Sequence, residues 1–241
     1  MPHDDALLVL NHLRDVIPPV VANFDARYES DLRQLGEWLA PSYSILGEYA
    51  RGDHHDEPLS TCVKLLWNAV DTVMAATELL RSGRTLQPPI LLRTVVIMLA
   101  TALHLRLHPE DLPTFETGVL EDKVVLATAK RVVTPFGRLY GLLSDDFVHV
   151  GLAHRMLHVR EQHDTKSELV AFNLTCIRHV TWLAYVTTEA IFVHSLKAPR
   201  YWKPVSETGV DYAPSPEETR RMNAWLALPP EAAPKTSPST T

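Results

Sequence analysis

The sequence predicts an all-α protein that folds as an antiparallel bundle of several helices. Nearly every long segment of the 241 residues carries apolar side chains at spacings of three and four, the period of one helix face. Alternating strand patterns with hairpin turns are missing from the sequence. Hydrophobic residues make up 46% of the chain, so their burial can offset the conformational entropy that is lost on folding.

A central pair of helices is the clearest part of this prediction. We expect the first from about Leu59 to Arg81, where Ser82-Gly83 ends it and the Arg81 cation suits the helix dipole. The second is expected from about Pro89 to Leu107, because a first turn tolerates proline. It is apolar on nearly all sides, so we place it at the centre of the bundle.

Further helices flank this pair, and prolines are expected to set their limits. Pro18-Pro19 should separate the first two helices, and Pro41 should kink or split the second. Pro135-Phe136-Gly137 should bend a later one. The expected ranges are Asp4 to Val16, Ser30 to Ala50, Thr117 to Leu143, Phe147 to Arg160 and Lys166 to Leu196.

Composition divides the chain into four parts. Prolines recur after Lys197, which predicts a Pro-rich C-terminal arm. Within it, Ser215-Pro216-Glu217-Glu218 is a good helix start, with serine as N-cap and proline at the first position. That helix would reach about Leu228 and lay Met222, Trp225 and Leu226 on the body or on a partner. The expected parts are N-terminal helices over 1–57, a helical-bundle core over 58–198, the arm over 199–228 and a disordered tail over 229–241.

Charge and cysteine content favour a cytoplasmic protein that binds neither membranes nor nucleic acids in general. The net charge is −6, whereas phosphate attraction needs basic clusters; a local basic groove would be an exception. Cys62 and Cys176 lie in apolar stretches and allow no disulfide framework. The acidic N-terminus does not resemble a signal peptide. Two apolar runs, Leu86 to Leu107 and Leu169 to Leu196, contain charged residues and are therefore expected to be buried helices rather than membrane spans.

Familiar catalytic and cofactor motifs are missing from the sequence. It contains no glycine-rich phosphate loop, no paired Cys-x-x-Cys pattern, no Gly-x-Ser-x-Gly and no His-Glu-x-x-His. We therefore expect no cofactor and lean towards a protein that is not an enzyme.

A histidine-rich stretch leaves two interpretations open. In a helix, His154 and His158 would lie one turn apart, with Glu161 about 20° from His154 on the same face. Two imidazoles and a carboxylate so placed could hold zinc or iron. The alternative, which we prefer, is a set of solvated side chains on an amphipathic helix.

Arg93 is the second candidate for a site, because it lies within an otherwise apolar helix. A buried guanidinium is costly unless it is paired. Asp145, Asp146, Glu189 or a turn carbonyl are the candidate partners. The interpretation we prefer is structural, with the stem of Arg93 packed inside and its head at the rim; the alternative is a ligand or partner site.

Two short motifs resemble a bacterial family of helical proteins related to the HEPN superfamily. One is Leu91-Leu92-Arg93-Thr94; the other runs from Tyr140 through Ser144 and Asp145 to His149. The resemblance covers roughly Thr61 to Leu196 and implies a polar cluster of Arg93, Ser144 and His149. The family often has a glutamate one turn after the arginine, where this chain has Ile97.

HEPN ribonucleases carry an arginine followed by a histidine after four to six residues, and no such pair occurs in this sequence. HEPN domains without that motif serve as binding or scaffold modules, often as dimers, and the resemblance implies such a role here. A link to stress or defence would fit the same resemblance.

Three functions stay in competition. The leading one is a non-catalytic helical module that binds a protein partner, its own copy as a homodimer, or a small ligand between helices. The second is a degenerate ribonuclease or toxin with a site at Arg138, Ser144, His149 and Arg155. The third is a metal-dependent helical-bundle enzyme that uses His154, His158 and Glu161.

Overall fold

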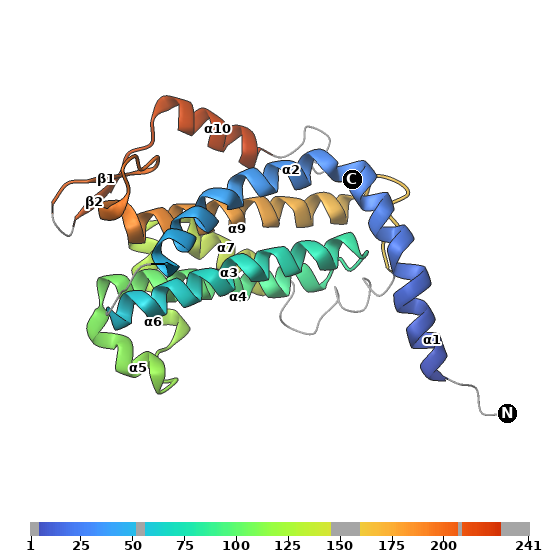
Figure 1. Cartoon of the computed structure of the whole chain (residues 1–241), viewed down its shortest axis with the longest axis horizontal. Coiled ribbons are helices and arrows are strands. Elements are labelled where there is room, and N and C mark those ends of the chain that lie inside the picture. The colour runs from blue at the N-terminus through green and yellow to red at the C-terminus, as the bar shows by residue number, and fades with distance from the viewer. Residues whose placement is uncertain (1–4, 52–55, 146–159, 207–208, 228–241) are drawn as a thin grey trace, which may run out of the picture.

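A computed structural model describes residues 5–51, 56–145, 160–206 and 209–227, and it shows a bundle of long helices (Figure 1). The prediction of an all-α bundle is confirmed. The helices are α1 (Asp5–Asn11), α2 (Ile17–Ala50), α3 (Glu57–Arg81), α4 (Gln87–Leu107), α5 (Leu112–Glu116), α6 (Asp122–Val132), α7 (Pro135–Asp145), α9 (Glu168–Phe192) and α10 (Pro216–Leu226). A π-helical turn covers His12–Val16, and 3-10 turns cover Pro109–Asp111 and Val193–Ser195.

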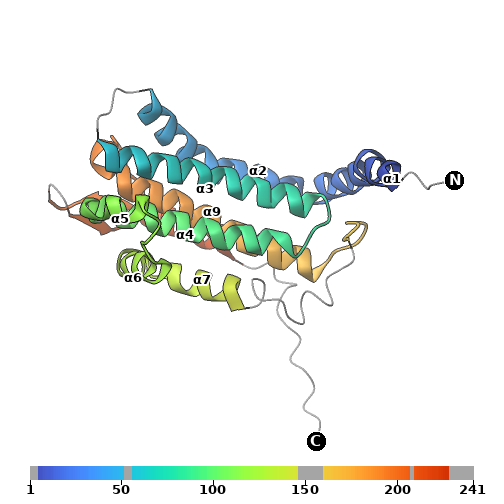
Figure 2. The same cartoon turned by 90° about the horizontal axis from the view of Figure 1, so that it is seen from below.

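The central pair, α3 and α4, begins and ends within two residues of the predicted limits. The Asp56 carboxylate caps α3 by accepting a hydrogen bond of 3.1 Å from the Leu59 N–H. Gly83 turns the chain between the two helices with a φ of +80°, a conformation that glycine adopts without steric cost. The short turn leaves the two helices antiparallel and side by side (Figures 1 and 2).

The core is built around α4 and α9, the two most apolar helices. α9 packs on α2, α3 and α4 and carries buried side chains along most of its length. By length and composition alone, Gln87–Leu107 and Glu168–Ser195 could each span a membrane; in the structure, 56% and 67% of their most apolar windows are buried. Buried core helices of this kind are as apolar as membrane spans, so the cytoplasmic location stays a prediction.

The prediction for the N-terminal prolines is wrong. Pro18 and Pro19 follow the π-helical turn of His12–Val16, and Val16 and Ile17 keep helical φ and ψ, so the chain stays helical through the two prolines. Pro41 lies inside α2 without ending it. The backbone leaves helical geometry instead at Tyr28, with φ −119° and ψ 23°. As a result, α1 extends away from the bundle in both views (Figures 1 and 2).

The segment predicted as one helix from Thr117 to Leu143 forms two, α6 and α7. The chain leaves helical geometry at Val133, and Pro135 then begins α7. A proline is favoured at a helix start and cannot supply the N–H that a continuous helix would need there. The helix predicted from Phe147 to Arg160 falls almost wholly outside the described residues.

Two short strands follow α9, although the sequence analysis predicted none. β1 (Trp202–Pro204) pairs antiparallel with β2 (Val210–Tyr212), with Trp202 opposite Tyr212. Three-residue strands are too short to show a reliable alternation in the sequence. Glu189 of α9 holds this hairpin: its Oε1 accepts backbone hydrogen bonds from Arg200, Tyr201 and Trp202 at 2.7, 2.6 and 3.0 Å.

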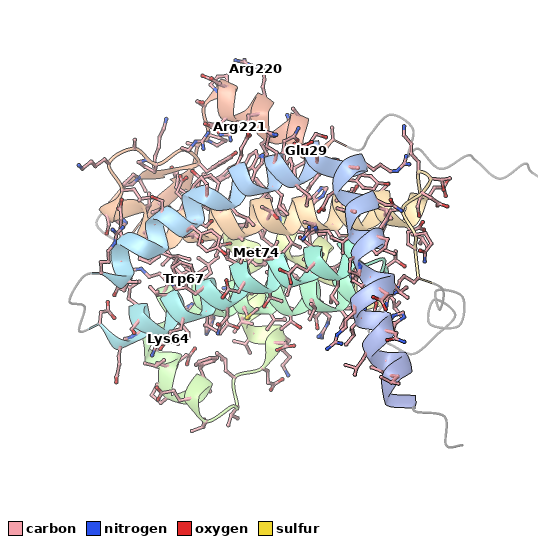
Figure 3. All side chains as sticks on the ribbon, turned by 45° about the vertical axis from the view of Figure 1, so that its right-hand side comes forward. Glu29, Lys64, Trp67, Met74, Arg220 and Arg221 are labelled. Atoms are coloured by element: carbon pink, nitrogen blue, oxygen red, sulfur yellow. The ribbon has the colours of Figure 1, made fainter. Side chains whose placement is uncertain are left out.

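The predicted helix start at Ser215 is confirmed, because the Ser215 hydroxyl accepts a hydrogen bond of 3.1 Å from the Glu218 N–H. α10 then packs on the bundle through Trp225, which is buried and stacks on Trp38 of α2 at 5.8 Å between ring centroids. The Arg221 guanidinium lies over the Trp38 ring as well, 4.9 Å from its centroid. Figure 3 shows Arg220 and Arg221 on α10 beside α2.

Candidate functional site

α7 brings different predicted site residues to two of its faces. Tyr140 and Ser144 are four residues apart and both contact Arg93 of α4. Arg138 and Leu142 are also four residues apart, and both line a cavity instead. At 100° per residue, Arg138 and Tyr140 point about 160° apart around the helix. The sequence analysis placed Arg138 and Ser144 together in the possible ribonuclease site, and helix geometry puts them on different faces of α7.

Arg93 is paired by two hydroxyl groups and, at a longer distance, by a carboxylate that was not among the predicted partners. Asp146 and the side chain of Asp145, which were predicted partners, lie outside the described parts of the chain. The Nε of Arg93 donates to the Ser144 hydroxyl at 3.0 Å, and its Nη2 donates to the Tyr140 hydroxyl at 2.6 Å. The guanidinium also lies 4.8 Å from the centroid of the Tyr140 ring. The Asp122 carboxylate of α6 is 3.9 Å away and completes the charge balance. This cluster ties α6 and α7 to α4.

The remaining predicted members of the polar cluster have separate outcomes. Asp145 ends α7, one residue beyond Ser144. His149 lies outside the described residues, so the implied contact with Arg93 stays a prediction. Glu189 was a candidate partner of Arg93, and this is wrong: it binds the backbone after α9 and is 1% exposed.

The predicted metal ligands do not form a described site. His154 and His158 lie outside the described residues. Glu161 follows a non-helical residue and is itself non-helical, so the angular argument that placed it beside His154 is wrong. Within the described ranges, no three histidine, cysteine or acidic side chains are grouped as metal ligands would be.

His163, close by, has a structural role. Its Nε2 hydrogen-bonds to the Leu80 carbonyl at 3.0 Å, and burial lowers the pKa of its imidazole. Arg27 of α2 donates to the carbonyls of His163 and Asp164 at 3.1 and 2.6 Å. These bonds fasten residues 160–164 to α2 and α3.

A cavity with a volume of about 1050 Å³ opens between α7, α9 and α10. Most of its wall is apolar or aromatic. The lining residues are Val132, Val133, Thr134, Pro135, Arg138, Leu139, Leu142, Phe172, Thr175, Cys176, His179, Trp182, Tyr212, Met222 and Leu226.

Polar groups line this cavity on both α7 and α9. Arg138 stands on α7 and is exposed. His179 stands on α9, and its Nδ1 lies 2.8 Å from the Thr175 carbonyl. Since a carbonyl only accepts, Nδ1 carries the proton in this arrangement, and Nε2 is left to accept a hydrogen bond in the neutral ring. The cavity therefore offers a cation on one wall and an acceptor on the other.

The other chemistry-bearing side chains of the wall are suited to binding rather than reaction. Burial raises the pKa of the Cys176 thiol to about 12, so this cysteine is protonated at neutral pH and is a poor nucleophile. Burial also raises the pKa of Tyr212. The indole N–H of Trp182 is buried and finds no acceptor among the described residues.

The sequence analysis missed the α9 wall of this site, although a signal was present. The lining residues of this wall follow one another at spacings of three, one, three and three, which places them on one stripe of a helix. They are Phe172, Thr175, Cys176, His179 and Trp182. The stripe mixes polar with apolar residues, so it does not stand out within an apolar helix.

Comparison with known proteins gives no relative for this chain: no family model, no curated protein and no solved structure matches it. The resemblance to the HEPN superfamily stays a prediction that rests on the two motifs.

Proposed function

We propose that this protein is a non-catalytic helical binding module that takes a small, largely apolar molecule into the cavity between α7, α9 and α10. The cavity is the observation that carries the proposal, because its volume of about 1050 Å³ and its mostly apolar wall match ligand sites in general. The few polar groups in the wall would orient the ligand.

The construction of the walls supports this proposal. α9 is a core helix, so Cys176 and Trp182 are held by packing on their other sides. α7 is tied to α4 by Arg93, and α10 is fixed by its stacked and buried Trp225. A site built on helices that are held in this way is pre-organised, and less ordering entropy is lost on binding.

Binding of Nile red, an uncharged apolar dye, tests the proposal. We expect saturable binding with one site per chain, visible as energy transfer from Trp182 in the cavity wall. Thr175→Trp should fill the cavity and abolish it. Thr72→Trp on α3 is the matched control, because both threonines are half-buried and donate to the carbonyl four residues earlier, but Thr72 does not line the cavity. Equal binding by the two variants would contradict the proposal.

Self-association is a second candidate function, and the N-terminal helical segment favours it. This segment extends from the bundle and exposes large apolar side chains to between 40 and 62%. Such side chains are normally covered when they gather on one surface, and a second copy would supply matching ones. The residues are Leu7, Val9, Leu10, Leu13 and Val16.

Light scattering after size-exclusion chromatography tests this second function. We expect a concentration-dependent dimer that Leu13→Glu disrupts. Val119→Glu is the control, because Val119 is 66% exposed but lies in a loop far along the chain from that segment. A monomer at all concentrations, or a dimer that survives Leu13→Glu, would remove self-association through this surface.

The predicted HEPN resemblance, cytoplasmic location and C-terminal arm fit the same proposal. A HEPN-like module without the ribonuclease motif would bind a ligand rather than cleave RNA. Its C-terminal arm would close one side of the ligand cavity. The ribonuclease alternative placed Arg138 and Ser144 in one site, and these residues lie on different faces of α7. RNA cleavage by the purified chain that is lost in His149→Ala would reinstate that alternative.

A further inference from the structure

We propose that the cavity selects an apolar molecule that carries a single anionic head group, such as a fatty-acid-like carboxylate. This inference rests on the proposed function, since it names the chemical class of the ligand for the same cavity. Its basis is the charge of the wall and the place of that charge relative to the apolar surface.

Among the described residues, the wall of the cavity carries a cation and no acidic side chain. The chain as a whole has 29 acidic residues against 23 basic ones, yet none of the described residues that line the cavity is Asp or Glu. Arg138 is the cation of the wall. A positive group in a partly apolar cleft raises the local concentration of anions, because the low-dielectric walls focus its field. The cavity is therefore complementary to a negative ligand although the molecule is acidic.

Arg138 lies where it can bind the carboxylate head group of a ligand while the apolar tail of that ligand is buried in the cavity. Its guanidinium is exposed, so a carboxylate bound to it keeps part of its hydration. Apolar lining residues continue on both helices, with Leu142 one turn beyond Arg138 on α7 and Phe172 two turns before His179 on α9. Met222 and Leu226 of α10 face the same space. A chain lying along this wall would bury apolar surface while its carboxylate accepts hydrogen bonds from Arg138.

Three probes of equal chain length separate this inference from the proposed function. Decanoate, decanol and decyltrimethylammonium carry a negative, a neutral and a positive head group on the same tail. Titration calorimetry with the full chain should give the tightest binding for decanoate and the weakest for decyltrimethylammonium. Decanol binding as tightly as decanoate would overturn the inference and leave the proposed function standing. Binding of none of the three would count against both.

Variants of Arg138 then locate the head group. Arg138→Gln should weaken decanoate binding by about three- to tenfold, the range for a partly exposed hydrogen bond to a charged group, and should change decanol binding less than about twofold. Arg138→Lys should restore part of the affinity. Arg220→Gln on α10 is the matched control, because Arg220 is exposed and lies outside the cavity wall (Figure 3). Equal effects of Arg138→Gln and Arg220→Gln would overturn the assignment.

Discussion

Replacing Glu189 by alanine is expected to weaken the attachment of the hairpin and α10 to the bundle. The Glu189 side chain is 1% exposed, and its Oε1 is the acceptor for three consecutive backbone N–H groups, those of Arg200, Tyr201 and Trp202. Alanine removes the acceptor while Tyr201 and Trp202 stay buried, so their N–H groups lose their partner in a place that water reaches poorly.

The expected magnitude follows from those three bonds. A buried donor without a partner costs about 1–3 kcal/mol, and removing the buried carboxylate returns part of this by ending its own desolvation. We expect Glu189→Ala to lower the free energy of unfolding by roughly 3–5 kcal/mol. Glu189→Gln keeps one carbonyl oxygen but loses the charge, so about 1–3 kcal/mol is expected.

Urea denaturation followed by tryptophan fluorescence measures the loss, and amide hydrogen exchange locates it. Trp202 and Trp225 are both buried against the bundle and report on the hairpin and on α10. Glu37→Ala is the control, because Glu37 is exposed on α2 and should change stability by less than about 0.5 kcal/mol. A loss below about 1 kcal/mol in Glu189→Ala, with the amides of residues 200–202 still protected, would refute the reasoning.

Three further predictions concern the turn between α3 and α4, the Arg93 cluster and the thiols. Gly83→Ala should lower the free energy of unfolding in urea by about 2–4 kcal/mol, because φ is +80° and the new Cβ would lie 2.2 Å from a backbone oxygen. Gly118→Ala is the comparison, because its φ is +71° but the new Cβ would meet no atom; it should lower the free energy of unfolding by about 1 kcal/mol. Arg93→Met should lose about 1–2 kcal/mol yet leave Nile red affinity unchanged; lost affinity with intact stability would instead mark Arg93 as a ligand contact. Burial raises the pKa of the Cys62 and Cys176 thiols from 9.0 to about 12. The contribution of each protonated thiol to the free energy of unfolding is therefore complete below pH 9. It falls by about 1.4 kcal/mol per pH unit as the pH rises towards 12, because the unfolded chain then ionises and the folded chain does not. Iodoacetamide labelling of the native chain at pH 8 should accordingly be slow at both thiols, and rapid labelling would contradict their burial.

The parts of the fold that follow local rules could be predicted from the sequence. The limits of α3 and α4 and the start of α10 depend on capping residues and on helical periodicity, which are local. The N-terminal prolines show where a local rule has two outcomes. Proline usually breaks a helix in its interior or starts one at its first turn, yet at Pro18-Pro19 the chain is helical on both sides, with a π-helical turn at His12–Val16 just before the prolines.

The candidate site was harder to predict because its residues meet only in three dimensions. Arg93 was identified because burying an unpaired guanidinium in an apolar helix costs free energy. Two of its observed partners, Tyr140 and Ser144, were among the candidate residues. The cavity is lined by residues of α7, α9 and α10, and α10 is held on the bundle by long-range contacts such as the stacking of Trp225 on Trp38 and the bond from the Trp225 indole to the Arg178 carbonyl. No periodicity in the sequence encodes such a long-range contact.

The stacked indoles of Trp38 and Trp225 give this protein an internal optical reporter. Their ring planes are 20° apart, and they belong to α2 and α10, which are separated by most of the chain. Two chromophores at 5.8 Å couple their electronic transitions, so the circular dichroism of the pair depends on whether α10 is seated. Displacement of that helix by a ligand, by acid or by substitution could then be followed without any attached dye.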